Sequence, residues 1–300
     1  MLGITIQKGS LSYHVDARQH RSNQRRLRQL PQVLKRIPEL SRHFVGKPQF
    51  IIERRGTLVT VAREDHRSEL RRLIKMHEEE YSERLSLSEW RLDTEYGGME
   101  EMAPFPITLH DVYEREGVTV KTGNPHCNNA GEEFYRALHA RFLGIVEAKS
   151  PIGFSLQTDD LYGVKQPGKM FYKHMEGQDL ESAISQGNHD LLNWALWESG
   201  KFFSRLLHAR LYLEDSDRIG NYFIEDNPAT KVFRFLDLER VSYRPVYSNE
   251  QKAEMLSKFI SKALADNFIT PERLGEFVIV CLGSHSRSPE LVERLQALAG

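Results

Sequence analysis

The order of secondary-structure signals between residues 107 and 210 constrains the fold more than any other feature of this sequence. Two β-rich runs, Ile107–Tyr113 and Val118–Lys121, predict a hairpin that turns at Gly117. Apolar residues then recur at three- and four-residue spacing over 131–148, which predicts a helix. A further strand at 170–174 and a long amphipathic helix at 189–210 follow. This order predicts an α+β domain that begins mainly with strands and continues mainly with helices.

The first hundred residues differ from the rest and predict an N-terminal α/β extension. Between Ala17 and His43, eight arginines and lysines occur against one acidic residue, Glu39. Apolar residues recur there every three or four positions, so a basic amphipathic helix is predicted, broken at Pro31 or Pro38. Two interpretations stay open: a solvated basic face, or a surface that binds anionic lipid or glycolipid.

A second set of signals completes this extension. Residues 49–53 and 57–61 predict a β-hairpin, and a charged helix is predicted from about 64 to 85. The turn-rich stretch at 93–106 then predicts a domain boundary. We therefore expect an extension at 1–100, either separate or part of the next domain's first lobe, and one domain at 101–300.

Composition limits the compartment and the partners. The formal net charge of −1 gives no large positive field, so no nucleic-acid partner is expected. Two cysteines, Cys127 and Cys281, suit a reducing compartment. No apolar stretch reaches the roughly 20 residues of a membrane span, and the N-terminus lacks the pattern of a secretory signal. We expect a cytoplasmic protein, a location compatible with peripheral contact at the inner membrane.

Several short motifs follow one another in an order that suits phosphoryl transfer. That chemistry needs a cation for the triphosphate, an acid to fix the cation, magnesium ligands and a group that positions the attacking hydroxyl. The motifs are Val118-Thr119-Val120-Lys121, a helix with Glu132 and Glu133, a strand passing through Gly177 into a short helix, Leu207-His208 followed by Asn221, and Phe235-Leu236-Asp237-Leu238-Glu239-Arg240. In this order they resemble the protein-kinase fold, and most closely the Kdo/WaaP family of lipopolysaccharide core kinases.

The resemblance implies a two-lobed protein-kinase-like fold, with a small, mainly β N-lobe at about 107–174 and a mainly α C-lobe at about 175–300. It also implies a nucleotide site. Lys121 corresponds to the lysine that holds the α- and β-phosphates of ATP, and Glu133 is its better partner of the two glutamates. Backbone groups at Lys173, His174 and Met175 would bind the adenine edge.

The resemblance further implies a magnesium site and a catalytic loop. Asn221 and Asp237 correspond to the magnesium ligands, and both offer the oxygen donors that this ion prefers. Ungapped spacing places Ser216 at the position of the catalytic aspartate, with Asp215 and Asp217 on either side. Serine cannot accept a proton at neutral pH as a carboxylate does. One of the flanking aspartates would therefore serve the acceptor hydroxyl.

Three hypotheses follow for function. The first is an ATP- and magnesium-dependent phosphotransferase whose acceptor is a hydroxyl of a sugar or glycolipid, with a lipopolysaccharide core sugar favoured by the resemblance. The second is a pseudokinase that binds a nucleotide or a protein without catalysis. Ser216 favours it, as does the lack of a glycine-rich loop before Lys121. The third is a lipid or nucleic-acid binder that uses the basic segment alone.

Overall fold

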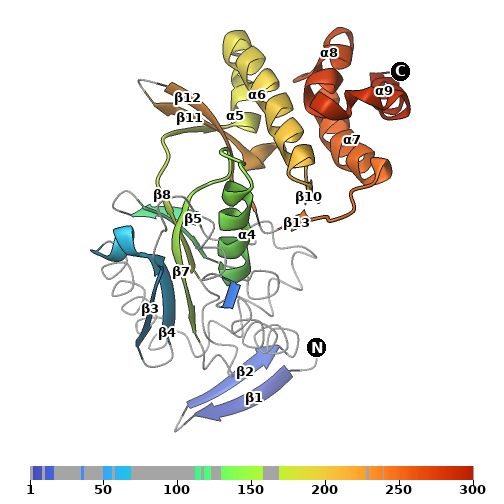
Figure 1. Ribbon diagram of the computed structural model, residues 1–300. Coiled ribbons are helices and arrows are strands. Elements are labelled where there is room, and N and C mark those ends of the chain that lie inside the picture. Colours follow the sequence, from blue (N-terminus) through green and yellow to red (C-terminus); the bar gives the residue numbers. More distant parts are fainter. Residues whose placement is uncertain are drawn as a thin grey trace. The chain divides into compact units, whose positions relative to one another are not determined.

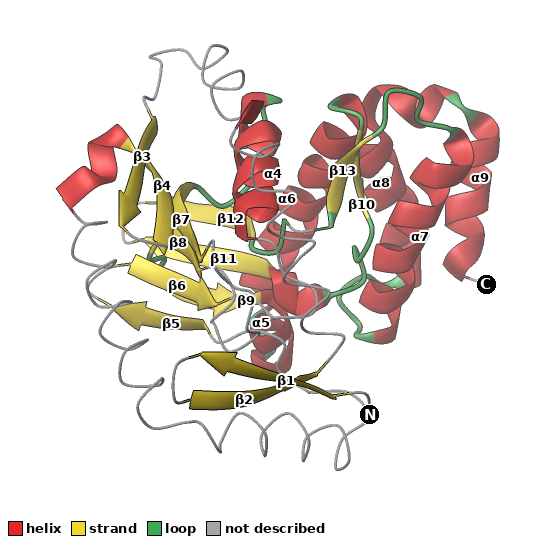
Figure 2. Cartoon of the chain, turned by 90° about the horizontal axis from the view of Figure 1, so that it is seen from below, coloured by secondary structure: helices red, strands yellow, loops and turns green. Residues whose placement is uncertain are grey.

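The computed structural model describes residues 3–8, 11–16, 35–36, 50–55, 58–68, 112–115, 118–122, 130–157, 169–227, 230–238 and 240–299. The chain divides into two compact units. The first contains Met1–Leu138 and Ser150–His174, and the second contains His139–Lys149 and Met175–Gly300. Figure 1 labels most of the helices and strands of both units, and Figure 2 also labels β6 and β9.

The first unit is built around a six-stranded antiparallel sheet with the strand order β3-β4-β7-β8-β6-β5. Both hairpins that the β-rich runs predict are present among the described residues, because β3 pairs with β4 and β5 pairs with β6. A separate hairpin joins β1 to β2. The elements are β1 (Gly3–Lys8), β2 (Leu11–Asp16), β3 (Phe50–Arg55), β4 (Leu58–Arg63), η1 (Glu64–His66), β5 (Val112–Arg115), β6 (Val118–Thr122), β7 (Pro151–Gln157) and β8 (Lys169–Lys173).

Helix α4 (Ala130–Phe142) packs against this sheet through a buried face. The ring centroid of Phe134 lies 5.1 Å from that of Phe154 on β7. Next to Phe154, the backbone of Gly153 approaches β4 so closely that a Cβ there would lie 2.4 Å from the Val61 carbonyl oxygen. Glycine is therefore required at this point of the sheet.

Helix α4 ends at Phe142, whereas the apolar spacing predicts a helix that continues to Ala148. Gly144 adopts a left-handed φ of +88°, which ends the helix at little conformational cost. The following turn is fixed by Arg141, whose Nη1 donates a hydrogen bond of 2.7 Å to the Ala148 carbonyl oxygen. The predicted end was wrong because the spacing of apolar residues continues through this turn.

The second unit combines two small sheets with a group of helices, which Figure 2 shows in yellow and red. One sheet has the order β12-β11-β9, and the other pairs β10 with β13. The elements are β9 (Gly177–Asp179), α5 (Leu180–Gln186), α6 (His189–His208), β10 (Leu211–Leu213), η2 (Ile219–Asn221), β11 (Tyr222–Asn227), β12 (Thr230–Phe235), β13 (Val241–Tyr243), α7 (Asn249–Ala265), α8 (Pro271–Leu282), η3 (Gly283–Arg287), α9 (Pro289–Gln296) and η4 (Ala297–Ala299).

The helices of this unit begin at residues suited to that position. Asp179, Asn188 and Ser248 each accept a hydrogen bond from a backbone N–H three residues later, at the starts of α5, α6 and α7. Pro271 and Pro289 begin α8 and α9, where a missing N–H costs nothing. The sequence therefore marks the start of each of these helices locally.

An aromatic cluster forms the centre of the second unit. It draws side chains from α6, from the β11–β12 hairpin and from α7, and all of them are almost fully buried. Ring centroids lie as close as 4.7 Å, between the phenylalanines of α6 and α7. The members are Phe202, Phe203, Tyr222, Phe233, Phe235 and Phe259. This cluster holds the hairpin that carries the candidate site of this unit.

The mixed α/β class predicted from the sequence is confirmed, whereas the two-lobed arrangement and the domain boundaries stay predictions. Only Lys35 and Arg36 of the predicted basic helix are described, and both are helical. The predicted charged helix is described only at 64–68, where it starts as η1. The predicted boundary at 93–106 lies outside the described residues. None of the helices described is both long and apolar enough to cross a membrane.

Candidate functional site

Lys121 and Glu133 form a buried ion pair in the first unit. Lys121 lies on β6, between β5 and β8, and Glu133 lies in the first turn of α4. The lysine Nζ is 3.3 Å from Oε1 and 3.2 Å from Oε2 of the glutamate. The lysine side chain is only 8% exposed, and that of the glutamate is fully buried. The pairing expected from the sequence is therefore present, while its contact with a nucleotide stays a prediction.

Tyr172 on β8 is a third member of this group, and its role was not predicted from the sequence. Its hydroxyl donates a hydrogen bond of 2.6 Å to Oε1 of Glu133. Tyr172 is opposite Thr119 in the β6–β8 ladder, so it shares a face of the sheet with Lys121 two residues along. Alternate residues of a strand point to the same face, so the sequence could have predicted that Tyr172 and Lys121 share one.

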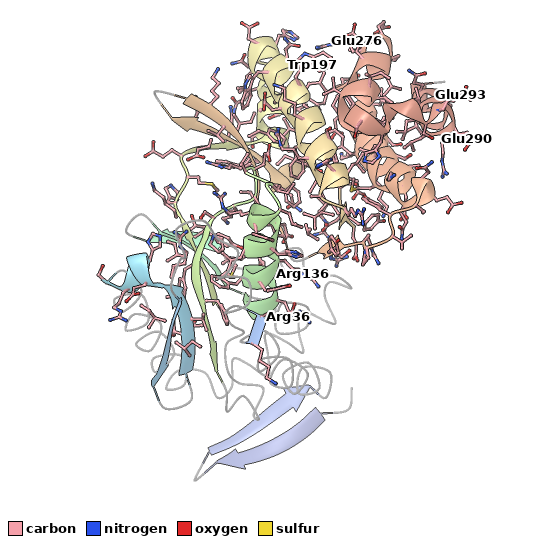
Figure 3. The ribbon with its side chains drawn as sticks, viewed as in Figure 1. Arg36, Arg136, Trp197, Glu276, Glu290 and Glu293 are labelled. Carbon is pink, nitrogen blue, oxygen red and sulfur yellow. The ribbon has the colours of Figure 1, made fainter. Side chains whose placement is uncertain are left out.

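The two neighbouring glutamates of α4 have different partners. Glu132 binds Arg36, whose Nη1 lies 3.4 Å from Oε2, and the Arg36 guanidinium also stacks 5.1 Å from the Tyr135 ring centroid. Figure 3 labels Arg36 beside α4. Glu133 is thus the partner of Lys121, while Glu132 contacts a residue of the basic segment.

The residues expected to bind adenine lie at the division between the units. Lys173 and His174 end the first unit, and Met175 begins the second. The side chains of Lys173 and His174 are exposed, and His174 Nδ1 lies 3.2 Å from the Thr119 hydroxyl on β6. Their role in binding a nucleotide stays a prediction.

In the second unit, the two aspartates of the loop between β10 and η2 differ in burial. Asp215 is 6% exposed, whereas Asp217 is exposed. Burial raises the pKa of the Asp215 carboxyl group, and the negative charge of Asp237 raises it further, against the opposing charge of Arg218. Asp215 is therefore the aspartate that lies near Asp237, a distinction that the spacing of the motif left open.

Ser216 points into the core of the same unit. Its hydroxyl donates a hydrogen bond of 2.6 Å to the Met255 carbonyl oxygen on α7. Its own carbonyl oxygen accepts a bond of 2.7 Å from the Tyr222 hydroxyl, and both side chains are fully buried. Ser216 thus anchors the loop, and this direction of its side chain leaves Asp215 as the better candidate for contact with an acceptor.

Asn221 and Asp237 lie at the same end of the β11–β12 hairpin. Asn221 comes directly before β11, and its carbonyl oxygen accepts a hydrogen bond of 2.9 Å from the N–H of Leu236, next to Asp237. Among the described residues, no acceptor lies within hydrogen-bond range of the buried Asn221 Nδ2, and the side-chain oxygen is the atom that could bind a metal ion. An amide and a carboxylate at one hairpin end match the oxygen donors that magnesium takes.

Two arginines also lie at this end of the unit, and neither was predicted as a site residue. The Nε atoms of Arg218 and Arg240 lie 3.6 Å and 4.0 Å from the same Asp215 oxygen, Oδ2. Glu239, the expected neighbour of Arg240, lies outside the described residues. In the part of the chain that the structure describes, no three His, Cys, Asp or Glu side chains gather into a metal-binding group.

The comparisons with known proteins add a distant likeness to solved structures. No family model matches the sequence, and no curated protein matches it. A solved structure described as WaaP in complex with acyl carrier protein is similar to this chain, with 14% identity and a TM-score of 0.43. The match covers 70% of this chain and 98% of that one. This likeness is to a protein of the family that the ordered motifs resemble, and the description of the site depends on its own geometry alone.

Proposed function

We propose that this chain is an ATP- and magnesium-dependent phosphotransferase that acts on a hydroxyl group. The observation that carries the proposal is the buried Lys121–Glu133 pair with Tyr172 bonded to it. Removing two charges from water is costly, so such a pair contributes little to stability on its own account. In a nucleotide site the same pair has a use, because Lys121 holds the phosphates and Glu133 fixes its direction.

The second unit offers the remaining groups that the reaction needs. Asp215 accepts the proton of the acceptor hydroxyl, since burial raises its pKa towards the working pH and makes it a stronger base than an exposed aspartate. Asn221 and Asp237 hold magnesium, which neutralises phosphate charge when bound. Transfer passes through a loose transition state, so positioning and charge neutralisation supply most of the catalysis.

The favoured acceptor is a sugar of a lipopolysaccharide core, on the strength of the ordered sequence motifs. The basic segment at 17–43 fits this acceptor, because a cationic amphipathic helix suits an anionic membrane or glycolipid surface. Peripheral contact with the inner face of a membrane follows as part of the proposal. No nucleic-acid partner is included.

A pseudokinase is the second candidate, and one observation favours it. Ser216 occupies the spacing of the catalytic aspartate, and its hydroxyl is already bonded to the Met255 carbonyl oxygen. A protein with this loop could bind ATP through Lys121 and still transfer nothing. The two candidates therefore differ in turnover and agree in nucleotide binding.

The experiment measures both properties on the full chain. ATP binding is followed by the shift in melting temperature with and without magnesium, and phosphate transfer is followed with labelled ATP towards core sugars and towards water. Asp215→Asn and Asp217→Asn are compared, because they make the same chemical change on opposite sides of Ser216. Asp237→Asn tests the metal ligand.

For an enzyme, Asp215→Asn should lower kcat by roughly 10²- to 10³-fold with little change in ATP affinity. Asp217→Asn should lower it far less. Asp237→Asn should weaken binding of ATP in the presence of magnesium. ATP binding without transfer to any acceptor would establish the pseudokinase, and a wild-type chain that does not respond to ATP would refute both candidates.

A further inference from the structure

Two arginines converge on the buried carboxylate of Asp215 from different elements. Arg218 follows in the same loop, and Arg240 comes directly before β13. Both present Nε to one oxygen of Asp215, at 3.6 Å and 4.0 Å. The Asp215 side chain is only 8% exposed, but those of the arginines are 50% and 44% exposed. Their guanidinium groups therefore extend from the carboxylate into solvent.

The two arginines carry more positive charge than Asp215 alone, and the negative charge of Asp237 also acts at this carboxylate. One carboxylate carries one negative charge, whereas the arginines carry two positive charges and five N–H donors each. Within the described part of the chain, Asp215 is the sole ion-pair partner of either arginine. At 3.6 Å and 4.0 Å these contacts are too long for hydrogen bonds, and no side chain among the described residues donates one to either Asp215 oxygen. Among the residues that the structure describes, no second acidic side chain pairs with either guanidinium group, so their donors can serve a ligand.

A purely structural role explains the arrangement poorly. Half-exposed ion pairs without hydrogen bonds stabilise a protein very little, because water screens them. Planar guanidinium groups, in contrast, bind phosphate or carboxylate through two parallel N–H donors. Two such groups within 4.0 Å of one carboxylate oxygen form a compact site for an anion beside the proposed base.

We propose that Arg218 and Arg240 bind an anionic group, a phosphate or a carboxylate, on the acceptor molecule. This proposal rests on the phosphotransferase function proposed above. The anion would lie within one monosaccharide of the hydroxyl that Asp215 deprotonates, so the acceptor is a sugar phosphate or a sugar acid. A neutral sugar of the same size would lack the group that the two arginines recognise.

Binding is tested first, without any need for turnover. Calorimetric titrations of the full chain use glucose 6-phosphate, glucuronate and glucose as probes. Binding of a phosphate, of a carboxylate and of a neutral sugar is thereby measured separately. The variants are Arg218→Gln, Arg240→Gln and Arg218→Lys, and Lys201→Gln is the matched control. Lys201 is an exposed cation on α6 that pairs with Glu198, so the control removes the same charge elsewhere in the unit.

Wild-type protein should bind at least one of the two anionic sugars more tightly than glucose. Each glutamine variant should lose about tenfold in that affinity, as expected for a lost charged hydrogen bond. Arg218→Lys should retain part of it, since the charge stays and the planar fork is lost. Equal binding of all three sugars by the wild type, or an equally large loss in Lys201→Gln, would overturn the proposal.

Steady-state kinetics distinguish whether the two arginines bind the acceptor or the nucleotide. If the arginines hold the acceptor, their variants should raise the KM for an anionic sugar by about tenfold and change the hydrolysis of ATP by water far less. If they hold the transferring phosphate instead, both rates should fall together, which would overturn the proposal. A chain without ATP turnover that still binds anionic sugars through these arginines would refute the phosphotransferase function and support the anion site.

Discussion

Replacing Lys121 with methionine should destabilise the first unit by roughly 3 kcal/mol. Methionine is similar in length and apolar, so the substitution removes the charge with little change in volume. Glu133 would then be buried with the Tyr172 hydroxyl as its one remaining partner among the described residues. A buried carboxylate without its cation is the principal cost.

The size of the effect follows from the geometry of the pair. At 3.2 Å, and with an effective dielectric constant of about 20, the attraction amounts to about 5 kcal/mol. The net cost is smaller than this attraction, because broken buried pairs usually cost about 3–5 kcal/mol. Because the hydrogen bond from Tyr172 to Glu133 persists, we expect a cost at the lower end of this range. For a unit of this size the melting temperature should fall by about 6–12 °C.

The matching double variant, Lys121→Met with Glu133→Leu, tests the reasoning further. An apolar pair leaves no buried charge, but the Tyr172 hydroxyl loses its bond to Glu133, so the double variant should lie within about 2 kcal/mol of the wild type. Thermal and urea unfolding without nucleotide measure these differences, with Lys173→Met as the control at an exposed lysine of β8. A Lys121→Met protein as stable as the control, or a double variant that loses the sum of both single effects, would refute the argument.

Three further predictions concern the second unit. Ser216→Ala should cost about 1 kcal/mol of unfolding free energy through the lost bond to Met255, whereas Ser216→Asp should cost roughly 3 kcal/mol or more because it buries a carboxylate; urea unfolding measures both. Gly177→Ala should cost about 2 kcal/mol or more in the same assay, since its φ is +144° and its Cβ would lie 2.0 Å from the Ile224 carbonyl oxygen. Burial lowers the pKa of His139 below 6.5, so the folded protein binds this proton less readily than the unfolded chain, and stability should fall as pH drops below about 6.5. His139→Phe should show a shallower fall between pH 7.5 and 5.5, and an unchanged slope would contradict this.

Much of the fold could be predicted because its signals are local. The β-rich runs of the first unit and the apolar spacing of α6 identify their elements within a short window. Strand β7 was not identified, because Pro151 and Gly153 weaken a strand signal. The need for Gly153 arises from its approach to Val61 on β4, which no local pattern records.

The candidate site could be predicted where one residue type at one spacing suffices. Lys121 and Glu133 were identified in this way, and the structure brings them together. The choice between Asp215 and Asp217 could not be made, because a shift of one residue in a loop reverses which side chain is buried. That choice depends on the bond from Ser216 to α7, a contact between residues far apart in the sequence.

The interleaving of the two units has a consequence for dividing this protein in the laboratory. The chain leaves the first unit after Leu138, returns at Ser150 and leaves again after His174. A fragment that begins at Met175 would therefore lack 139–149, whose backbone at Glu147 and Lys149 pairs with Phe235 at distances of 3.0 Å and 3.3 Å. A single cut cannot yield both units intact. We therefore expect the edge of β12 to be preserved when the protein is reassembled from two fragments that each include residues 139–149.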